Sequence, residues 1–560
     1  MNNFIRKNIN IIIVLFILIQ PILDLLTGLC LHLLNINLTI GIIIRVLFMI
    51  LIVYTSLFVF KKKKLIIPYL LIFIYCILYL IGIIVYKETG IFYELQGLVK
   101  VMYYPIMLLS IYSIKDEINI SKLTLFTILF LYLIFIFIPT LFGLGYKTYE
   151  ITKIGTLGFF NSANEISGII SILTPFMFVI LIESKKVILK LLITIMYLVV
   201  ILMMGTKTPF LSLGIVIGMT FIYLWFNWLH KKEYKKLVYS FVIILVGILL
   251  SIIIVPQTNF YKNIETELKF IKVDDPTEIF SSYKLVDHAI FGQRLSFLEK
   301  RSLDYKFSNN YQKLVGIGYL KNGKETKQVE MDYFDIFINH GLIGFLIVMS
   351  VIMYIIKDII INHKKIDYEN YMTITSIILI FILSLMTGHI ITAPAVSILT
   401  IIIFISLIKQ DKERIIIAIG NSNYLKDKLK SLKIIDYDKY KVTVITDKKV
   451  SVTNNINLIV NKPSTNKFIN LLKVLMFKIV NYKTYEHSIC NGYDLNSIYV
   501  TYMKDASYDS TLYIEKQDIK EDEFIMDIVL EYNKIIVDNK EIENKIIKKY
   551  PLLKDKIEIE

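Results

Sequence analysis

The chain of 560 residues has little of what marks several common protein classes. It contains only 3 cysteines, too far apart for a disulfide framework or a zinc motif: Cys30, Cys76 and Cys490. Its 11 prolines and 23 glycines are too few for a collagen-like or low-complexity chain. Charged residues make up 19% of the sequence, below the level of about a quarter that is typical of soluble domains. These shortages exclude a disulfide-rich secreted scaffold, a fibrous protein and a disordered chain.

Arginine is scarce among the basic residues. Of the 62 lysines and arginines, only five are arginine: Arg6, Arg45, Arg294, Arg301 and Arg414. A net charge of +15 would suit a nucleic-acid partner if the basic residues formed one face of the protein. They lie instead in short segments between apolar runs, where basic residues orient membrane helices. We therefore expect no nucleic-acid partner.

Long apolar runs fill residues 1–408, whereas residues 409–560 have the composition of a soluble domain. A run of about 20 apolar residues is long enough to cross a bilayer. The sequence predicts about twelve transmembrane helices, with ten to fourteen as the open range. They are expected at 9–30, 40–60, 65–86, 97–114, 121–145, 159–182, 187–204, 207–229, 237–255, 333–356, 371–388 and 391–408. The pattern indicates a multi-pass, all-α membrane protein with one soluble domain at its C-terminal end.

The basic residues predict the orientation of these helices. With the N-terminus inside, the inner connections hold 21 lysines and arginines, and the short outer connections hold 4. Because basic residues accumulate on the cytoplasmic side, both termini are expected in the cytoplasm. One connection, residues 256–332, is long and falls on the outer side, and a loop of this size usually carries function.

The segment 409–560 begins with an apolar strand in RIIIAIG, followed by a helical stretch. Two further apolar strands follow, in KYKVTVITD and NINLIV. Alternating strands and helices predict a cytoplasmic α/β domain of the Rossmann-like type.

Ionisable residues inside spans are costly and usually face a cavity or a partner. Asp24 and Arg45 are expected at one depth near the outer ends of two neighbouring spans. Other polar residues also fall near outer ends of spans, namely Lys100, Glu165, Lys207 and His389. Two interpretations stay open: a cationic cavity for an anionic lipid headgroup, or a structural role in which Asp24 and Arg45 form an ion pair and Lys100 extends its ammonium group to the interface.

Three segments resemble the O-antigen ligase and polysaccharide polymerase family. MGTKTPFLSLGIVIG at 204–218 is similar to the start of one of its spans. FGQRLSFLEKR at 291–301, followed by LVGIGY at 314–319, is similar to the outer loop of the family. EMDYFDIFINHGLIGFL at 330–346 is similar to the signature with which that loop enters the next span. The order and spacing of the segments make the resemblance specific over residues 1–408.

The resemblance implies a GT-C-like, metal-independent glycosyltransferase in a bacterial cell membrane, with no cofactor. It implies transfer of a glycan, outside the membrane, from an undecaprenyl-diphosphate carrier to a hydroxyl of a glycan or lipid acceptor, in a surface polysaccharide ligase or polymerase. Lys207 and Arg294 stand at basic positions of the family motifs. Glu330 stands where many ligases have histidine, which is a departure from the pattern.

The chemistry of the residues is consistent with this reaction. A departing diphosphate needs cations, and the fork of donors on arginine suits phosphate oxygens. Arg294 and Arg301 are seven residues apart in a predicted helix, so that both can face one side. Lys207 and Arg45 could add charge from the membrane, and Glu330 or Asp332 could act as general base.

Simpler interpretations stay open for each of these residues. Arg294 and Arg301 could be surface residues of an amphipathic helix. Glu330 and Asp332 could cap a helix, because carboxylates favour helix N-termini. The group 161–165 could cap the sixth span, and His389 could be a turn residue.

Two other functions would share part of this pattern. A transporter or flippase of lipid-linked glycans would also use many spans and a cationic cavity, but would show related halves and broken midplane helices. A receptor would need a signalling motif in the tail, and none is present. The tail, residues 409–560, resembles half of a two-domain (GT-B) glycosyltransferase and lacks a G-x-G-x-x-G or P-loop motif.

Overall fold

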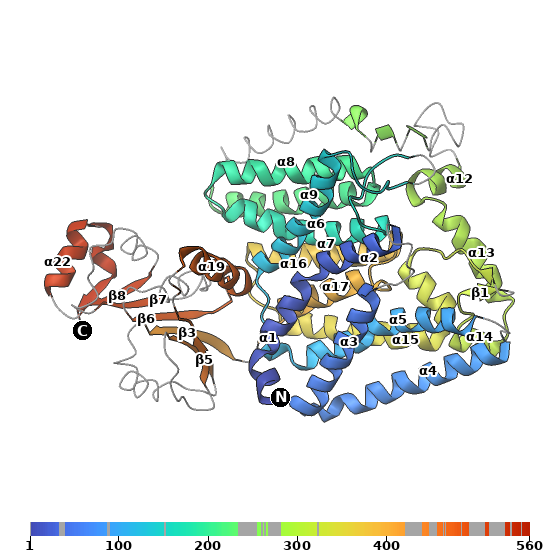
Figure 1. Ribbon diagram of the computed structural model, residues 1–560, viewed down its shortest axis with the longest axis horizontal. Coiled ribbons are helices and arrows are strands. Elements are labelled where there is room, and N and C mark those ends of the chain that lie inside the picture. The colour runs from blue at the N-terminus through green and yellow to red at the C-terminus, as the bar shows by residue number, and fades with distance from the viewer. Residues whose placement is uncertain are drawn as a thin grey trace. The chain divides into compact units, whose positions relative to one another are not determined.

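The computed structural model of the protein is mostly helical, with a sheet near the C-terminus (Figure 1). It describes residues 2–32, 40–86, 90–149, 153–232, 255–258, 261–262, 265–266, 282–321, 324–410, 412–419, 439–446, 456–462, 464, 466–482, 484–491, 510–514, 532–537, 540–549 and 551–559. The chain divides into two compact units. The first comprises Met1–Arg6, Leu15–Ile114 and Leu125–Lys409, and the second comprises Lys7–Val14, Lys115–Thr124 and Gln410–Glu560.

Ten helical segments of the described chain are long and apolar enough to cross a membrane. They are Asn2–His32, Ile40–Val59, Lys63–Tyr86, Ile91–Ser113, Lys122–Leu141, Ala163–Glu183, Val187–Met204, Lys207–Leu229, Asp332–Ile361 and Tyr368–Met386. Each overlaps one predicted span, so these ten predictions are confirmed as helices of sufficient length. The predicted span 237–255 lies outside the described residues.

The helices of these segments carry the labels of Figure 1. They are α1 (Asn2–Leu18), α2 (Gln20–His32), α3 (Ile40–Tyr54), α4 (Ile66–Tyr86), α5 (Ile91–Ser113), α6 (Lys122–Leu141), α7 (Ala163–Glu183), α8 (Val187–Met204), α9 (Lys207–His230), α15 (Asp332–Ile361) and α16 (Tyr368–Met386). Short π and 3₁₀ turns extend α3 and precede α4: η1 (Thr55–Val59) and η2 (Lys63–Leu65).

The last predicted span, 391–408, is a shorter helix than expected. Helix α17 (Pro394–Leu407) has 14 residues, and all of them are buried. Such a helix is about 21 Å long at 1.5 Å per residue, less than the apolar thickness of a bilayer. It packs against α5 on one side and α7 and α16 on the other, so protein surrounds it (Figure 1).

The segment before α15 contains short helices and a small hairpin. Its elements are α12 (Tyr283–Val286), η6 (Asp287–Phe291), α13 (Arg294–Lys306), α14 (Asn310–Val315), β1 (Leu320–Lys321) and β2 (Lys324–Glu325). These elements make up the described C-terminal part of the predicted outer loop.

The second unit contains a seven-stranded parallel sheet. The predicted strands are present as β3 (Glu413–Ile419), β4 (Tyr440–Thr446) and β5 (Ile456–Val460). The sheet continues with β6 (His487–Asn491), β7 (Ser510–Ile514), β8 (Lys534–Val537) and β9 (Ile557–Ile559). The strand order is β5-β4-β3-β6-β7-β8-β9, which reverses direction between β3 and β6.

Both faces of the sheet are apolar, as a parallel sheet covered on both sides requires. Alternate residues of β3 separate into two clusters, one containing Ile416 and Ala418 and the other Ile415 and Ile417. The described helices of residues 410–560 are α19 (Lys467–Asn481) and α22 (Lys540–Lys549), with the short helix η10 (Pro551–Lys556). The helix expected directly after β3 lies outside the described residues.

Candidate functional site

Helix α13 begins at Arg294, and Asp287 fixes that start. The Asp287 carboxylate is buried and accepts hydrogen bonds from the backbone N–H groups of Leu295 and Ser296, at 2.8 and 2.9 Å. A carboxylate at this position satisfies free N–H groups of the first turn and favours the helix dipole. Asp287 thereby holds Arg294 at the first position of the helix.

Glu330 lies two residues before the start of α15 and contacts Arg294, Lys327 and Asn164; these four residues are called the Glu330 cluster. Arg294 donates from Nη2 to Glu330 Oε2 at 3.2 Å and from Nε to the Glu330 carbonyl at 3.1 Å. Lys327 forms an ion pair with the other carboxylate oxygen, Oε1. Asn164, in the first turn of α7, donates to Oε2 at 3.3 Å. The Glu330 carboxylate thus links α13, the segment after β2 and α7.

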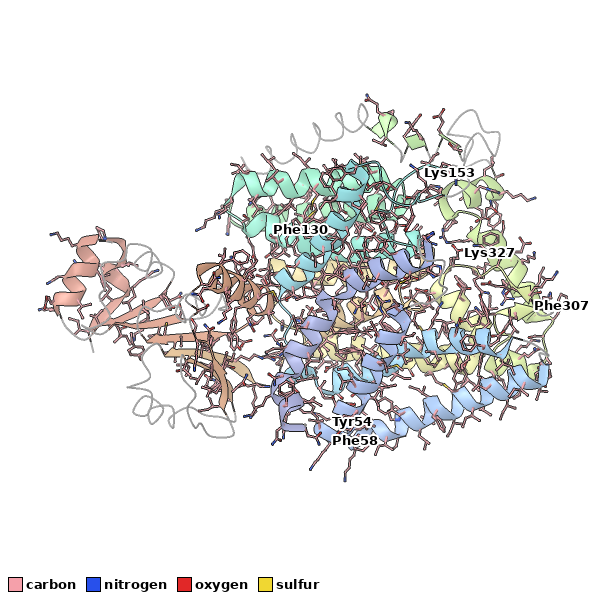
Figure 2. All side chains as sticks on the ribbon, in the orientation of Figure 1. Tyr54, Phe58, Phe130, Lys153, Phe307 and Lys327 are labelled. Atoms are coloured by element: carbon pink, nitrogen blue, oxygen red, sulfur yellow. The ribbon has the colours of Figure 1, made fainter. Side chains whose placement is uncertain are left out.

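Lys327, labelled in Figure 2, is the more exposed of the two cations beside Glu330. Its ammonium group lies 5.4 Å from the centre of the Phe297 ring on α13. The Arg294 side chain is only 15% exposed and the Glu330 side chain 20%, so the pair is largely buried and keeps a small exposed part.

The pKa of the Glu330 carboxyl group reflects opposing effects. Burial raises this pKa, because desolvation penalises the charged form. The hydrogen bond and charge of Lys327 lower it, as do the charges of Arg294 and His389, and the net pKa lies below the ordinary value. Glu330 is therefore a carboxylate at neutral pH.

His389 and Glu330 come from two loops with unusual backbone conformations. Both residues have positive φ angles, 58° and 61°, which side-chain-bearing residues rarely adopt. Between them, Gly388 lies so close that a Cβ atom there would stand 2.5 Å from the Glu330 carbonyl oxygen.

Asp332, the other predicted general base, is fully engaged with the loop before α17. Its carboxylate accepts three backbone N–H groups, from residues 389, 390 and 391, at 2.8 to 2.9 Å. The Thr392 hydroxyl donates a fourth hydrogen bond at 2.6 Å. Asp332 is 1% exposed. It satisfies backbone groups of a loop that would otherwise be costly to bury.

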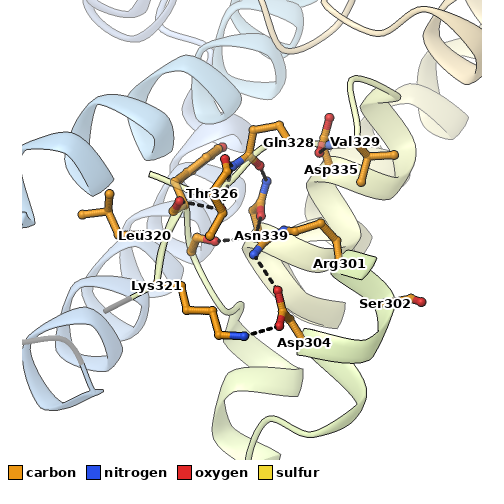
Figure 3. A network of polar contacts seen from close by, with 12 residues as sticks. Arg301, Ser302, Asp304, Leu320, Lys321, Thr326, Gln328, Val329, Asp335 and Asn339 are labelled. Atoms are coloured by element: carbon orange, nitrogen blue, oxygen red, sulfur yellow. Dashed lines mark hydrogen bonds and ion pairs between the residues drawn. The ribbon is translucent and has the colours of Figure 1, made fainter. Parts of the chain in front are cut away.

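Arg301, seven residues after Arg294 on α13, meets different groups. Its Nη2 donates to the Gly318 carbonyl at 2.9 Å and to Asn339 Oδ1 at 2.7 Å, and Nη1 lies 3.4 Å from Asp304 (Figure 3). Asn339 in turn donates to Gln328 at 2.6 Å. Burial lowers the pKa of the Arg301 guanidinium, which is 4% exposed. Arg301 ties α13 and the 316–318 turn to α15.

The second and third family-like motifs, at 291–319 and 330–346, are joined by backbone hydrogen bonds. Gly341 breaks the helical conformation of α15, with φ 65° and ψ −174°. Just before this break, two carbonyls of α15 accept hydrogen bonds from the turn at 316–318. The Ile317 N–H donates to the Ile338 carbonyl at 3.2 Å, and the Gly318 N–H donates to the Asn339 carbonyl at 3.0 Å. A Cβ on Gly316 would stand 2.1 Å from the Asn339 carbonyl oxygen, so this contact requires glycine. The two motifs form one structural joint.

The two remaining predicted cations, Arg45 and Lys207, belong to α3 and α9. Arg45 of α3 pairs with Asp24 of α2 at 2.5 Å and donates to Gln20 at 2.8 Å, and it is buried. Tyr132 of α6 donates to the second Asp24 oxygen at 2.6 Å. The ion pair considered as the simpler interpretation is therefore present. Lys207 begins α9, directly after Thr206, whose hydroxyl accepts a hydrogen bond from Ser167 at 2.9 Å.

Two charged residues important to this region were not predicted. Lys327 precedes Glu330 by three residues, a spacing that could have indicated the pair. Glu94, near the start of α5, is buried and accepts N–H groups of Tyr319 and Leu320 and the hydroxyl of Tyr79. A carboxylate at the start of a predicted span could have marked it. Ser162 of the 161–165 group caps α7 by accepting the Glu165 N–H, and Asn164 donates to Glu330.

The described residues contain no group of three or more His, Cys, Asp or Glu side chains arranged to hold a metal ion. A comparison with protein families finds that the model described as "O-antigen ligase like membrane protein" matches residues 6–413. The match includes the Glu330 cluster and the joint between the two motifs. No curated protein and no solved structure gives a significant match to the chain.

Proposed function

Because the chain belongs to the family of O-antigen ligase like membrane proteins, we propose that it transfers a glycan from undecaprenyl diphosphate to a hydroxyl group of a glycan or lipid acceptor. The reaction takes place at the extracytoplasmic face of a bacterial cell membrane, where the positive-inside count places the loop before α15. The observation that carries this proposal is the sharing of the Glu330 carboxylate between Arg294 and Lys327.

In the proposed reaction, the acceptor hydroxyl oxygen attacks the anomeric carbon of the donor sugar. The bond from this carbon to the diphosphate oxygen breaks, and its electron pair leaves with undecaprenyl diphosphate. The hydroxyl proton passes to Glu330, whose lowered pKa keeps it in the accepting form. The products are a new glycosidic bond and the free lipid diphosphate.

The shared carboxylate couples the base to the cations. Before proton transfer, Glu330, Arg294 and Lys327 together carry a charge of +1. When Glu330 takes the proton, the same three groups carry +2, at the moment when the diphosphate gains negative charge. The two cations are released from their anionic partner and can bind phosphate oxygens more strongly. Glu330 is a better candidate than Asp332 for the base, because four hydrogen bonds already occupy the buried Asp332 carboxylate.

The other predicted cations receive different roles in this proposal. Arg301 positions the joint between α13 and α15, and Arg45 holds α2 against α3 through Asp24. Lys207 stays a candidate for auxiliary charge at the membrane side of the site. In the second unit, the parallel sheet with its reversal between β3 and β6 supports a Rossmann-like domain, similar to half of a GT-B glycosyltransferase.

The test uses the purified full chain in proteoliposomes, with a radiolabelled undecaprenyl-diphosphate glycan and candidate acceptors. We expect covalent transfer of label in the wild type, loss of transfer in Arg294→Ala, and partial recovery in Arg294→Lys, because lysine lacks the fork of donors. Lys300→Ala, on the exposed side of α13, is the matched control and should retain activity.

The products also distinguish the possible reactions. Growth of the lipid-linked chain indicates a polymerase, and transfer to another acceptor indicates a ligase. Movement of the donor across the bilayer without any covalent change would contradict the proposal and identify a flippase. Wild-type transfer by Arg294→Ala would remove Arg294 from the site.

A further inference from the structure

Helix α19 of the second unit has an exposed apolar face. Val474 and Phe477 pack towards the buried cluster that contains Ile416 and Leu512. The opposite side of the helix consists of exposed large apolar residues: Phe468, Ile469, Leu471, Leu472, Leu475 and Met476. Phe468 is 65% exposed and Leu471 64%. Contiguous apolar exposure of this kind marks an interaction surface.

Hydrogen bonds place one end of α19 at the beginning of a membrane-spanning helix. Ser121 and Thr124, at the start of α6, both donate from their hydroxyl groups to the carbonyl of Ile479, at 2.6 and 2.7 Å. Asn119 donates to the carbonyl of Thr484, just after α19. Residues Lys115–Thr124 belong to the same compact unit as α19. The last turn of α19 therefore lies against the segment that leads into α6.

The charge of this segment fits one leaflet in particular. Residues 461–482 contain four lysines, Lys462, Lys467, Lys473 and Lys478, and no acidic residue. A helix with an apolar face and lysines as its only charged residues suits the interface of an anionic membrane. The positive-inside count assigns the start of α6 to the cytoplasmic side, where the anionic lipid surface attracts such segments.

We propose that α19 lies in the headgroup region of the cytoplasmic leaflet, with Phe468, Leu471 and Leu475 inserted among the acyl chains. The proposed partner is an anionic lipid surface, and the helix is a second membrane attachment of the C-terminal domain besides the connection at Lys409. The contacts with residues 119–124 hold one end of the helix beside the start of α6, and the apolar face sets its rotation.

The test labels the helix in the full-length protein. Cys30, Cys76 and Cys490 are replaced by serine, serine and alanine, and a single cysteine is introduced by Leu471→Cys or, as a second variant, Leu475→Cys. An NBD fluorophore on this cysteine is measured in nanodiscs of phosphatidylethanolamine and phosphatidylglycerol, with and without nitroxide-labelled phospholipid. Asn544→Cys, exposed on α22, is the matched control.

We expect NBD at residues 471 and 475 to emit at shorter wavelength than at residue 544, and to lose most of its intensity to the nitroxide lipid. Equal emission and equal quenching at the three positions would overturn the proposal, because the helix face would then be in water. A blue-shifted emission without lipid quenching would also overturn it, because protein and not lipid would cover the face.

Discussion

Glu330 takes part in two kinds of interaction that depend on the same protonation state. As a carboxylate it accepts hydrogen bonds from Arg294, Lys327 and Asn164, and it is the group that would receive the acceptor proton. Neutralising it without changing its size separates these tasks. The two cations would keep their positions near the site, while proton acceptance would be lost.

We expect Glu330→Gln to reduce turnover by roughly 10²–10⁴ fold, the usual contribution of general-base catalysis. The glutamine cannot accept the proton, whereas binding of the lipid-linked donor should be kept or strengthened, because Arg294 and Lys327 no longer face an anionic partner. Transfer rates and donor binding are measured separately on the purified protein. Glu299→Gln, on an exposed position of α13, serves as the control, and equal turnover in both variants would exclude Glu330 as the base.

Lys327 should set the pH dependence of the reaction through Glu330. The pKa of Glu330 is lowered chiefly by Lys327, so the wild-type acid limb of kcat/KM should lie below the ordinary carboxyl pKa of about 4.3. In Lys327→Met the lowering interaction is lost while burial still raises the pKa. The acid limb should therefore move to higher pH.

The measurement is a pH profile of kcat/KM for the wild type, Lys327→Met and Lys324→Met. Lys324 lies on the exposed strand β2 and provides the control for loss of one positive charge. A shift of the acid limb in the control as large as that in Lys327→Met would contradict a specific pairing with Glu330.

At the scale of elements, the site depends on helices that are interrupted. Helix α15 is broken at Gly341, and α17 begins only after the loop at 387–393. In both places, backbone groups that a continuous helix would satisfy are satisfied by another segment. The 317–318 turn donates to the carbonyls before Gly341, and Asp332 accepts from the loop before α17. These two sets of hydrogen bonds hold the 317–318 turn against α15, and α15 against the loop before α17.

We expect Asp332→Asn to destabilise the protein by about 2–3 kcal/mol, because an amide nitrogen would face N–H donors and leave buried groups unpaired. The loss should appear as a lower Tm in detergent and a lower membrane level. Asp304→Asn, whose partly exposed carboxylate pairs with Lys321 and Arg301, is the comparison and should cost less, because these pairs are less buried than Asp332. Wild-type stability with lost turnover in Asp332→Asn would instead identify Asp332 as the base.

The sequence was most informative where structure follows from length and composition. Apolar runs of about 20 residues located ten helices, and alternating apolar segments located strands β3, β4 and β5. It was less informative for Asp332, because its partners are backbone N–H groups 57 to 59 residues further along the chain. The spacing of seven placed Arg294 and Arg301 on one helix, α13. It could not predict that Arg301 meets Asn339, which depends on how α15 breaks at Gly341.

At the scale of the whole molecule, the proposed reaction depends on the sidedness of the loop before α15. Inner connections hold 21 basic residues and short outer ones 4, which predicts this loop outside. A cysteine introduced by Lys324→Cys should therefore react with an impermeant thiol reagent in intact cells, whereas Lys62→Cys, exposed before α4, should react only after permeabilisation. The reverse pattern would place the Glu330 cluster on the cytoplasmic side and contradict the proposed donor access.

The short, buried helix α17 also has a consequence for how the protein is made. Fourteen residues are too few for the insertion machinery to retain as an independent span. The helix must therefore insert together with α16, or enter the bilayer later, when it can pack against α5 and α7. The final stage of biogenesis is then an assembly step, in which α17 packs against helices that are already in the bilayer.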